Sequence, residues 1–128
     1  MRCAAGRIIR PDDLSLIARL IRDLADYEKL SHDVTFDETR LRNELFGDAP
    51  VAFVWIAERE NESVGFALCF YNFSTFLGKR GIYIEDVYVD PDYRGKGIGK
   101  ALFRHIAKQA VTEDCGRVEW QVLDWNQP

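Results

Sequence analysis

One stretch of the chain, residues 82–100, constrains the fold more than any other, because it joins a strand to a helix through a glycine-rich turn. It reads IYIEDVYVDPDYRGKGIGK: an apolar strand with two carboxylates, an Asp-Pro-Asp turn and a glycine run. A helix is expected from about residue 97 to 113, where apolar residues recur at helical spacing. Another apolar segment, residues 117–123, follows this helix. The helix is therefore a crossover, and its two flanking strands are expected to run parallel.

The rest of the chain adds strands and helices around this unit. A short strand is expected at residues 7–10, and helices from about Pro11 toward Glu28 and from Asp37 to Phe46. Two segments that are apolar on both alternations, 51–58 and 64–71, are joined by a short turn and favour an antiparallel hairpin. A loop at 72–80 and a third strand at 81–89 follow. This order predicts one α/β domain over residues 1–128, a mixed and mostly antiparallel sheet with helices on both faces.

The composition argues against several classes of function. The 17 basic and 21 acidic residues give a net charge of −4, which speaks against general nucleic-acid binding. The three cysteines form no CxxC pair, so neither a disulfide framework nor a metal site is expected, and a reducing compartment is the simpler interpretation. No apolar run approaches the roughly 20 residues of a membrane-spanning helix. We therefore expect a cytoplasmic protein with no membrane partner.

The glycine run suggests an anion site. Glycines let backbone approach a ligand closely, and a helix start presents unpaired N–H groups and the positive end of a dipole. Arg94, Lys96 and Lys100 add positive charge. The run is not a Walker loop, because Ala101 stands where a magnesium-binding hydroxyl is needed, and its third glycine is out of place for a Rossmann fingerprint.

The carboxylates are the second part of the predicted site. Glu85 and Asp86 are adjacent, so in a regular strand they point to opposite faces. Asp86 has a structural alternative, in which it pairs with an arginine or caps a loop. Glu28 continues the apolar stripe of the first helix, and is either an ordinary surface acid at the helix end or, with Tyr27, the rim of a pocket.

Together these motifs resemble the GNAT superfamily of N-acetyltransferases, and more closely its spermidine/spermine (diamine) and thialysine N-acetyltransferase family. Residues 94–99 match the pattern [QR]-x-x-G-x-[GA] of the pyrophosphate loop. The closer likeness is carried by residues 24–28 (LADYE), 82–89 (IYIEDVYV), 93–99 (YRGKGIG) and 123–127 (LDWNQ). The resemblance implies a GNAT fold, acetyl-CoA as the acetyl donor and a small primary amine (a polyamine, a diamine or thialysine) as acceptor, with direct attack in a ternary complex.

The resemblance also implies residue roles. The strand at 81–89 is expected to carry a bulge that separates it from the next strand, and one backbone N–H, assigned to Val87, to polarise the thioester carbonyl. Glu85 is expected to act as a base, directly or through water. Cofactor contacts are implied for Val87, Tyr88, Val89, Arg94, Gly95, Lys96, Gly97, Ile98, Gly99, Lys100 and Asn126. Amine contacts are implied for Tyr27, Glu28, Glu85, Glu119, Trp120 and Gln121, with a core-facing position as the alternative for Trp120.

The sequence departs from that family at its C-terminal end. The family continues with another helix and two strands, and this helix carries the tyrosine proposed to protonate the leaving thiolate. This sequence stops at Pro128, so we expect a C-terminally incomplete domain without that tyrosine. The alternatives are a GNAT enzyme for a protein or antibiotic amine, and a non-catalytic acyl-CoA-binding module. A homodimer is expected from the resemblance alone.

Overall fold

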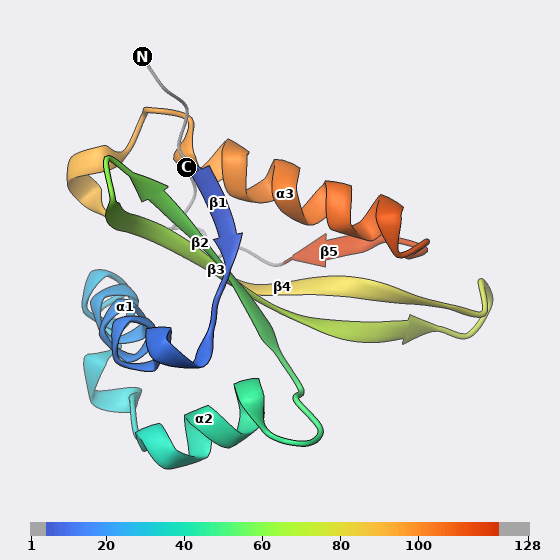
Figure 1. Ribbon diagram of the computed structural model, residues 1–128, viewed down its shortest axis with the longest axis horizontal. Coiled ribbons are helices and arrows are strands. Elements are labelled where there is room, and N and C mark those ends of the chain that lie inside the picture. The colour runs from blue at the N-terminus through green and yellow to red at the C-terminus, as the bar shows by residue number, and fades with distance from the viewer. Residues whose placement is uncertain (1–4, 121–128) are drawn as a thin grey trace.

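The computed structural model describes residues 5–120 and contains a five-stranded sheet with the order β1-β2-β3-β4-β5 (Figure 1). The strands are β1 (Ala5–Ile8), β2 (Phe53–Arg59), β3 (Glu62–Ser74), β4 (Lys79–Val89) and β5 (Val118–Trp120). The first four pair antiparallel, and β4 pairs with β5 in parallel. The mixed, mostly antiparallel sheet and its parallel crossover pair are thus confirmed.

Helices cover both faces of this sheet. Figure 1 shows α3 (Ile98–Thr112) above it, and α1 (Leu14–Tyr27) and α2 (Glu38–Phe46) below it. Short 3-10 turns, η1 (Pro11–Asp13), η2 (Ser31–Asp33) and η3 (Pro91–Tyr93), lead into or between the larger elements. Asp37 caps α2 by accepting a hydrogen bond from the Arg40 amide at 2.7 Å. Within residues 5–120, no helix is long and apolar enough to cross a membrane.

The two faces of the sheet bury two separate apolar clusters, which hold the helices in place. The cluster between the sheet and α3, referred to below as the cluster under α3, consists of Ala57, Val64, Ala67, Cys69, Ile82, Ile84, Ile98, Leu102, Ile106 and Ala110. The cluster between the sheet and the pair α1 and α2 consists of Ile9, Ile17, Leu20, Leu24, Leu45, Val54, Ile56, Phe66 and Tyr88. Strands β2 and β3 contribute to both clusters, which explains why their sequences are apolar on both alternations.

The β3–β4 hairpin is longer than the sequence pattern predicts. The expected loop at residues 72–80 is wrong at both ends, since pairing continues to Ser74 opposite Lys79. The remaining turn closes with a hydrogen bond from the Gly78 amide to the Ser74 carbonyl at 2.8 Å, and Gly78 takes a φ of 64°. A positive φ favours glycine, which fixes the turn at this position. Figure 1 shows this hairpin projecting beyond the helices.

Candidate active site

Strand β4 is bulged in its middle, at the position of the predicted acids. Its register with β3 pairs Leu68 with Asp86 but the next residue, Cys69, with Ile84, so Glu85 is the extra residue. The pattern of burial agrees, because Ile84 and Val87, three positions apart, pack on the same α3 side. The bulge implied by the family resemblance is therefore confirmed, and the strand is not regular at Glu85 and Asp86.

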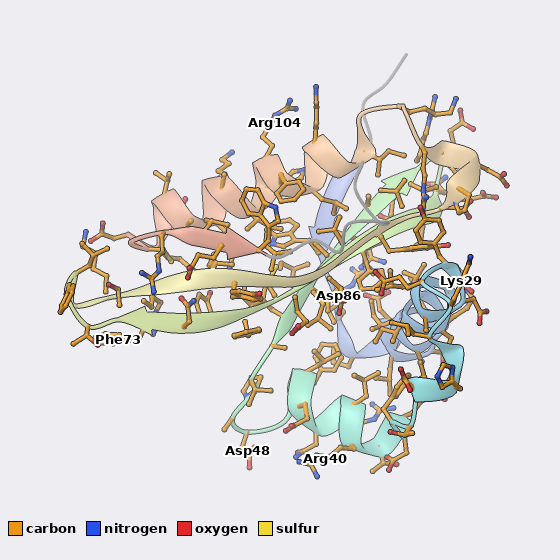
Figure 2. The ribbon with its side chains drawn as sticks, turned by 180° about the vertical axis from the view of Figure 1, so that it is seen from behind. Lys29, Arg40, Asp48, Phe73, Asp86 and Arg104 are labelled. Atoms are coloured by element: carbon orange, nitrogen blue, oxygen red, sulfur yellow. The ribbon has the colours of Figure 1, made fainter. Side chains whose placement is uncertain are left out.

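The bulge places Asp86 on the face of β4 that looks toward α1, together with Tyr88. Figure 2 shows Asp86 below the sheet, on the side of α1 and α2. Burial, followed by the charges of Glu85 and Glu28, raises the pKa of the Asp86 carboxyl from 3.8 to about 6. Among residues 5–120 no hydrogen bond or ion pair reaches this carboxyl, so neither structural alternative, an arginine partner or a loop cap, applies in the described part of the chain.

Glu28 is positioned by the way α1 ends. It is the C-cap residue, and Lys29 follows with a φ of 60°. The Leu30 amide donates to the Ala25 carbonyl at 2.8 Å and the Lys29 amide to the Asp26 carbonyl at 3.1 Å, as in a Schellman motif. Partial burial raises the pKa of Glu28. The helix end therefore holds a partly desolvated carboxylate close enough to act on Asp86, while Glu85 is exposed.

The predicted cofactor loop forms an open cradle. Gly95 and Gly97 have φ values of 76° and 80°, and residues 94–97 are exposed, whereas Ile98 is buried as the anchor of α3. Among the described residues, no atom beyond the adjoining backbone lies within 4 Å of a Cβ built on Gly95, Gly97 or Gly99, so that part of the molecule leaves the loop surface unobstructed. The first amides of α3 have no acceptor within the helix. Bare backbone, a helix start and nearby lysines suit the pyrophosphate of an acyl-CoA.

Arg94 and the last residues of β4 link this loop to the bulge. The Arg94 Nε donates a hydrogen bond to the Val89 carbonyl at 3.0 Å, and the guanidinium lies over the ring of Tyr27. Val87 and Val89 pack against the apolar cluster under α3, and Tyr88 packs on the opposite side. In the described part of the chain, β5 pairs with β4 only along Ile82–Ile84, so residues 85–89 have no β5 neighbour there.

The residues expected from β5 do not gather around Asp86. Glu119 bonds to Arg117 Nε and to Asn72 Nδ2, both at 2.9 Å, on the face away from α3. Trp120 shares the α3 face with Val118 and packs on Phe103, with ring centroids 5.2 Å apart, and is 53% exposed. The two side chains therefore lie on opposite faces of the sheet. Gln121 and Asn126 lie outside the described residues.

Comparison with known proteins shows which family has this arrangement of bulged strand, glycine loop and helix start. The sequence model of the Acetyltransferase (GNAT) family matches residues 17–128. The chain belongs to the GNAT acetyltransferase family. It is therefore a GNAT N-acetyltransferase, a member of a family that uses acyl-CoA, and the predicted GNAT fold is confirmed.

Individual relatives agree with this GNAT assignment. The chain is 41% identical to a thialysine N-epsilon-acetyltransferase of Bos taurus, over 94% of this chain and 75% of the relative. It is 32% identical to the L-ornithine N5-acetyltransferase NATA1 of Arabidopsis thaliana, over 94% of this chain and 72% of the relative. An aminoglycoside acetyltransferase solved with sisomicin superposes with a TM-score of 0.83 at 21% identity, over 97% of this chain and 80% of that one. At that identity the likeness concerns the fold.

The sequence pattern assigned no role to Asp86, which the structure brings to the face of β4 that looks toward α1. The alternation of side chains in a regular strand put Asp86 on the face opposite Glu85 and did not say which helix that face would meet. The signal that could have found it was the bulge itself, because one extra residue reverses which side chains face α1. Among residues 5–120, no group of three or more His, Cys, Asp or Glu side chains is arranged to hold a metal ion.

Proposed function

We propose that this GNAT enzyme transfers acetyl from acetyl-CoA to a small primary amine of the polyamine, diamine or thialysine type. The observation that carries the proposal is Asp86, a largely buried carboxylate without a partner in the described residues, beside Glu28 and Glu85. Such a cluster attracts a cation, and an alkylammonium supplies one. The relatives named for thialysine and ornithine act on acceptors of this class.

The donor is proposed to lie along the loop and the end of β4. Residues 95–100 would hold the pyrophosphate through backbone amides and the helix start. Val87 to Val89 would contact the pantetheine and acetyl group, with the Val87 N–H as donor to the developing oxyanion. Asn126 remains a proposed cofactor contact by resemblance. Acetyl-CoA, when bound, supplies the activated thioester.

The amine is proposed to be prepared by two carboxylates with different tasks. Asp86, helped by Glu28 and Tyr27, binds the ammonium, and exposed Glu85 accepts its proton through a water molecule. The nitrogen lone pair then attacks the thioester carbonyl, the C–S bond breaks, and the departing thiolate takes up the proton that the attacking nitrogen loses. Glu119, Trp120 and Gln121 are retained as proposed contacts for the distal part of the acceptor, although Trp120 lies on the α3 face.

Thiol release from acetyl-CoA tests the proposal directly. The purified chain is assayed with thialysine, ornithine, spermidine and an aminoglycoside, and acetyl-CoA binding is measured by calorimetry in parallel. We expect turnover with at least one of the first three. Release only with the aminoglycoside would replace the acceptor class, and tight binding without any release would indicate a non-catalytic acyl-CoA-binding module.

The base assignment needs its own variant. Glu85→Gln should lower turnover at saturating amine about tenfold, less than for a buried base, because Glu85 is exposed and bulk water can replace it. Unchanged turnover at pH 7 would remove Glu85 from the mechanism.

The loop assignment is tested by two glycine substitutions. Gly97→Val forces a β-branched residue into a φ of 80° at the N-cap of α3, and should abolish measurable acetyl-CoA binding. Gly99→Ala is the matched control, because Gly99 is helical, has open space around its Cβ, and stands where the loop pattern accepts alanine. Equal affinity of the Gly97→Val variant and the wild type would contradict the pyrophosphate loop.

We further propose a single-domain cytoplasmic homodimer. Phe73 and Phe76, on the projecting β3–β4 hairpin, are 65% and 100% exposed, which supports a protein contact there. Free Cys69 and Cys115 are compatible with a reducing compartment. Light scattering during size exclusion measures the mass in solution, and a monomer at all concentrations would contradict the dimer.

A further inference from the structure

Arg94 reaches from the cofactor loop to two other segments of the molecule. Its Nε donates to the Val89 carbonyl at 3.0 Å, at the end of β4. Its guanidinium carbon lies 3.9 Å from the centre of the Tyr27 ring and 5.9 Å from that of Tyr88. Both distances are within the range in which a cation is attracted to a ring face. A single side chain therefore joins the loop, α1 and β4.

Tyr27 passes this contact on to the carboxylates. It is the last residue of α1, directly before Glu28, and its ring meets that of Tyr88 nearly edge-on with centroids 6.4 Å apart. Tyr88 lies two residues after Asp86 on the same face of β4. A displacement of the Tyr27 ring would move the turn that carries Glu28, whose charge acts on Asp86. The cofactor loop and the carboxylate cluster are thus in contact through two rings.

We propose that Arg94 is a positioning residue that couples the two sites, so that cofactor bound in the glycine loop holds Tyr27 and Glu28 in place for the amine. This rests on the proposed amine N-acetyltransferase function. The loop residues before α3 are exposed, and a bound pyrophosphate would order them. Arg94 then has a fixed position over Tyr27, and the end of α1 is ordered with it. By linkage, cofactor and amine raise each other's affinity.

The coupling differs from a direct contact between Arg94 and the pyrophosphate. A phosphate ligand acts through its charge, which lysine preserves. A coupling residue needs the planar guanidinium that stacks on the ring and donates to Val89, which lysine does not reproduce. Tyr27 belongs to α1 and lies outside the glycine loop, so an effect of Tyr27 on cofactor affinity is the signature of coupling.

The experiment measures CoA affinity by calorimetry for Arg94→Lys, Tyr27→Leu, the double variant and Tyr27→Phe. We expect each of the first two to weaken CoA about 3- to 10-fold, in keeping with the strength of a cation–π contact. The double variant should be no weaker than the worse single one, and Tyr27→Phe, which keeps the ring, should match the wild type. Additive losses, or unchanged affinity in Tyr27→Leu, would overturn the coupling.

Hydrogen exchange of the backbone amides in residues 24–30 supplies a measurement that needs no amine substrate. Saturating CoA should slow their exchange in the wild type and in Lys96→Gln, a loop control that loses charge but keeps Arg94. In Arg94→Lys, equally saturated with CoA, the slowing should be lost, and the amine KM should rise several-fold. Equal slowing in both variants would overturn the proposal. If no amine is acetylated, the proposed function fails while these CoA measurements still decide the coupling.

Discussion

Asp13 and Asp86 are two carboxylates that lie mostly below the surface, one before α1 and the other in the bulge of β4. The Asp13 carboxylate accepts hydrogen bonds from both terminal nitrogens of Arg7, at 2.7 and 2.9 Å, and from the Arg10 amide at 2.8 Å. Arg7, itself raised in pKa by this contact, lowers the pKa of Asp13 to about 2. Burial, followed by the like charges of Glu85 and Glu28, raises the pKa of Asp86 to about 6, and within residues 5–120 no partner of opposite charge offsets this.

The difference separates a carboxylate that holds the fold together from one that we propose binds the ammonium of the acceptor. A buried charge normally costs free energy unless it is paired, and Asp13 meets that condition with groups of its own chain. Asp86 costs stability in the described structure, and an arriving ammonium would relieve that cost. Perturbed carboxylates of this kind concentrate at functional sites.

Replacement of Asp86 should damage activity and replacement of Asp13 should not. Asp86→Asn removes the charge that would bind the ammonium, and kcat/KM for the amine should fall about 100-fold, since hydrogen bonds to charged groups are worth roughly 1.5–3 kcal/mol. Most of the loss should appear in the amine KM. Asp13→Asn, assayed below its unfolding temperature, should retain wild-type kcat/KM. Equal losses in both variants would erase the distinction between the two acids.

The sequence predicted the loop better than the carboxylates, for a physical reason. The positive φ of Gly95 and Gly97 and the start of α3 follow from local chemistry, which adjacent residues encode. The environment of Asp86 depends on the bulge at Glu85 and on a register set by β3, far away in the chain. Alternation counts positions and misses an inserted residue, so by itself it does not predict which side of the sheet Asp86 faces.

The fold as a whole shows the same difference between features that adjacent residues encode and features that depend on distant strand pairing. The boundaries of α2 and α3 were predicted within one or two residues, because periodicity and caps such as Asp37 are local signals, whereas the helix expected from Pro11 begins as the 3-10 turn η1 and becomes α1 only at Leu14. The loop at 72–80 was mistaken because apolar and polar residues there gave no strand pattern, whereas pairing with β4 extended β3 to Ser74. In β5 alternation holds, because Val118 and Trp120, two residues apart, both face α3, although Trp120 stays half exposed.

The two acids should affect stability with opposite signs. Asp13→Asn should lower the free energy of unfolding by about 1–2 kcal/mol at pH 7, because it breaks a partly exposed, bidentate ion pair. Asp86→Asn should raise it by roughly 2–3 kcal/mol at pH 7, the value of a pKa shift from 3.8 to about 6. Urea unfolding of both variants beside the wild type measures the difference.

The pH dependence of stability sharpens this test. Asp13 has a lowered folded pKa, so its contribution is present above about pH 4 and is lost as the pH falls through about 2. Asp86 has a raised folded pKa, so its cost is absent below about pH 4 and complete above about pH 6. The stabilisation by Asp86→Asn should therefore vanish at pH 4. A gain that persists there would have a cause other than the charge of Asp86.

Turnover should report the same ionisation. Asp86 binds an ammonium only when it is deprotonated, so wild-type kcat/KM should fall as the pH drops below about 6, nearly tenfold per unit. The ionisation of the free amine is common to every variant. The ratio of wild-type to Asp86→Asn rates at each pH therefore isolates Asp86. A ratio that is flat between pH 5 and 7 would contradict its role, whereas the same ratio for Asp13→Asn should be flat.

The smallest expected effect is that of replacing Glu28, the carboxylate of α1 that acts on Asp86. Glu28 contributes a like charge that raises the pKa of Asp86, after burial and Glu85. Glu28→Gln removes this charge and keeps the shape of the side chain, so the acid limb of kcat/KM should move to lower pH by less than one unit. Glu38→Gln, at the exposed start of α2, is the matched control and should leave the limb in place. An acid limb that moves to higher pH would mean that Glu28 does not act on Asp86 as a negative charge. Glu85 would then be the only like charge left to act on Asp86.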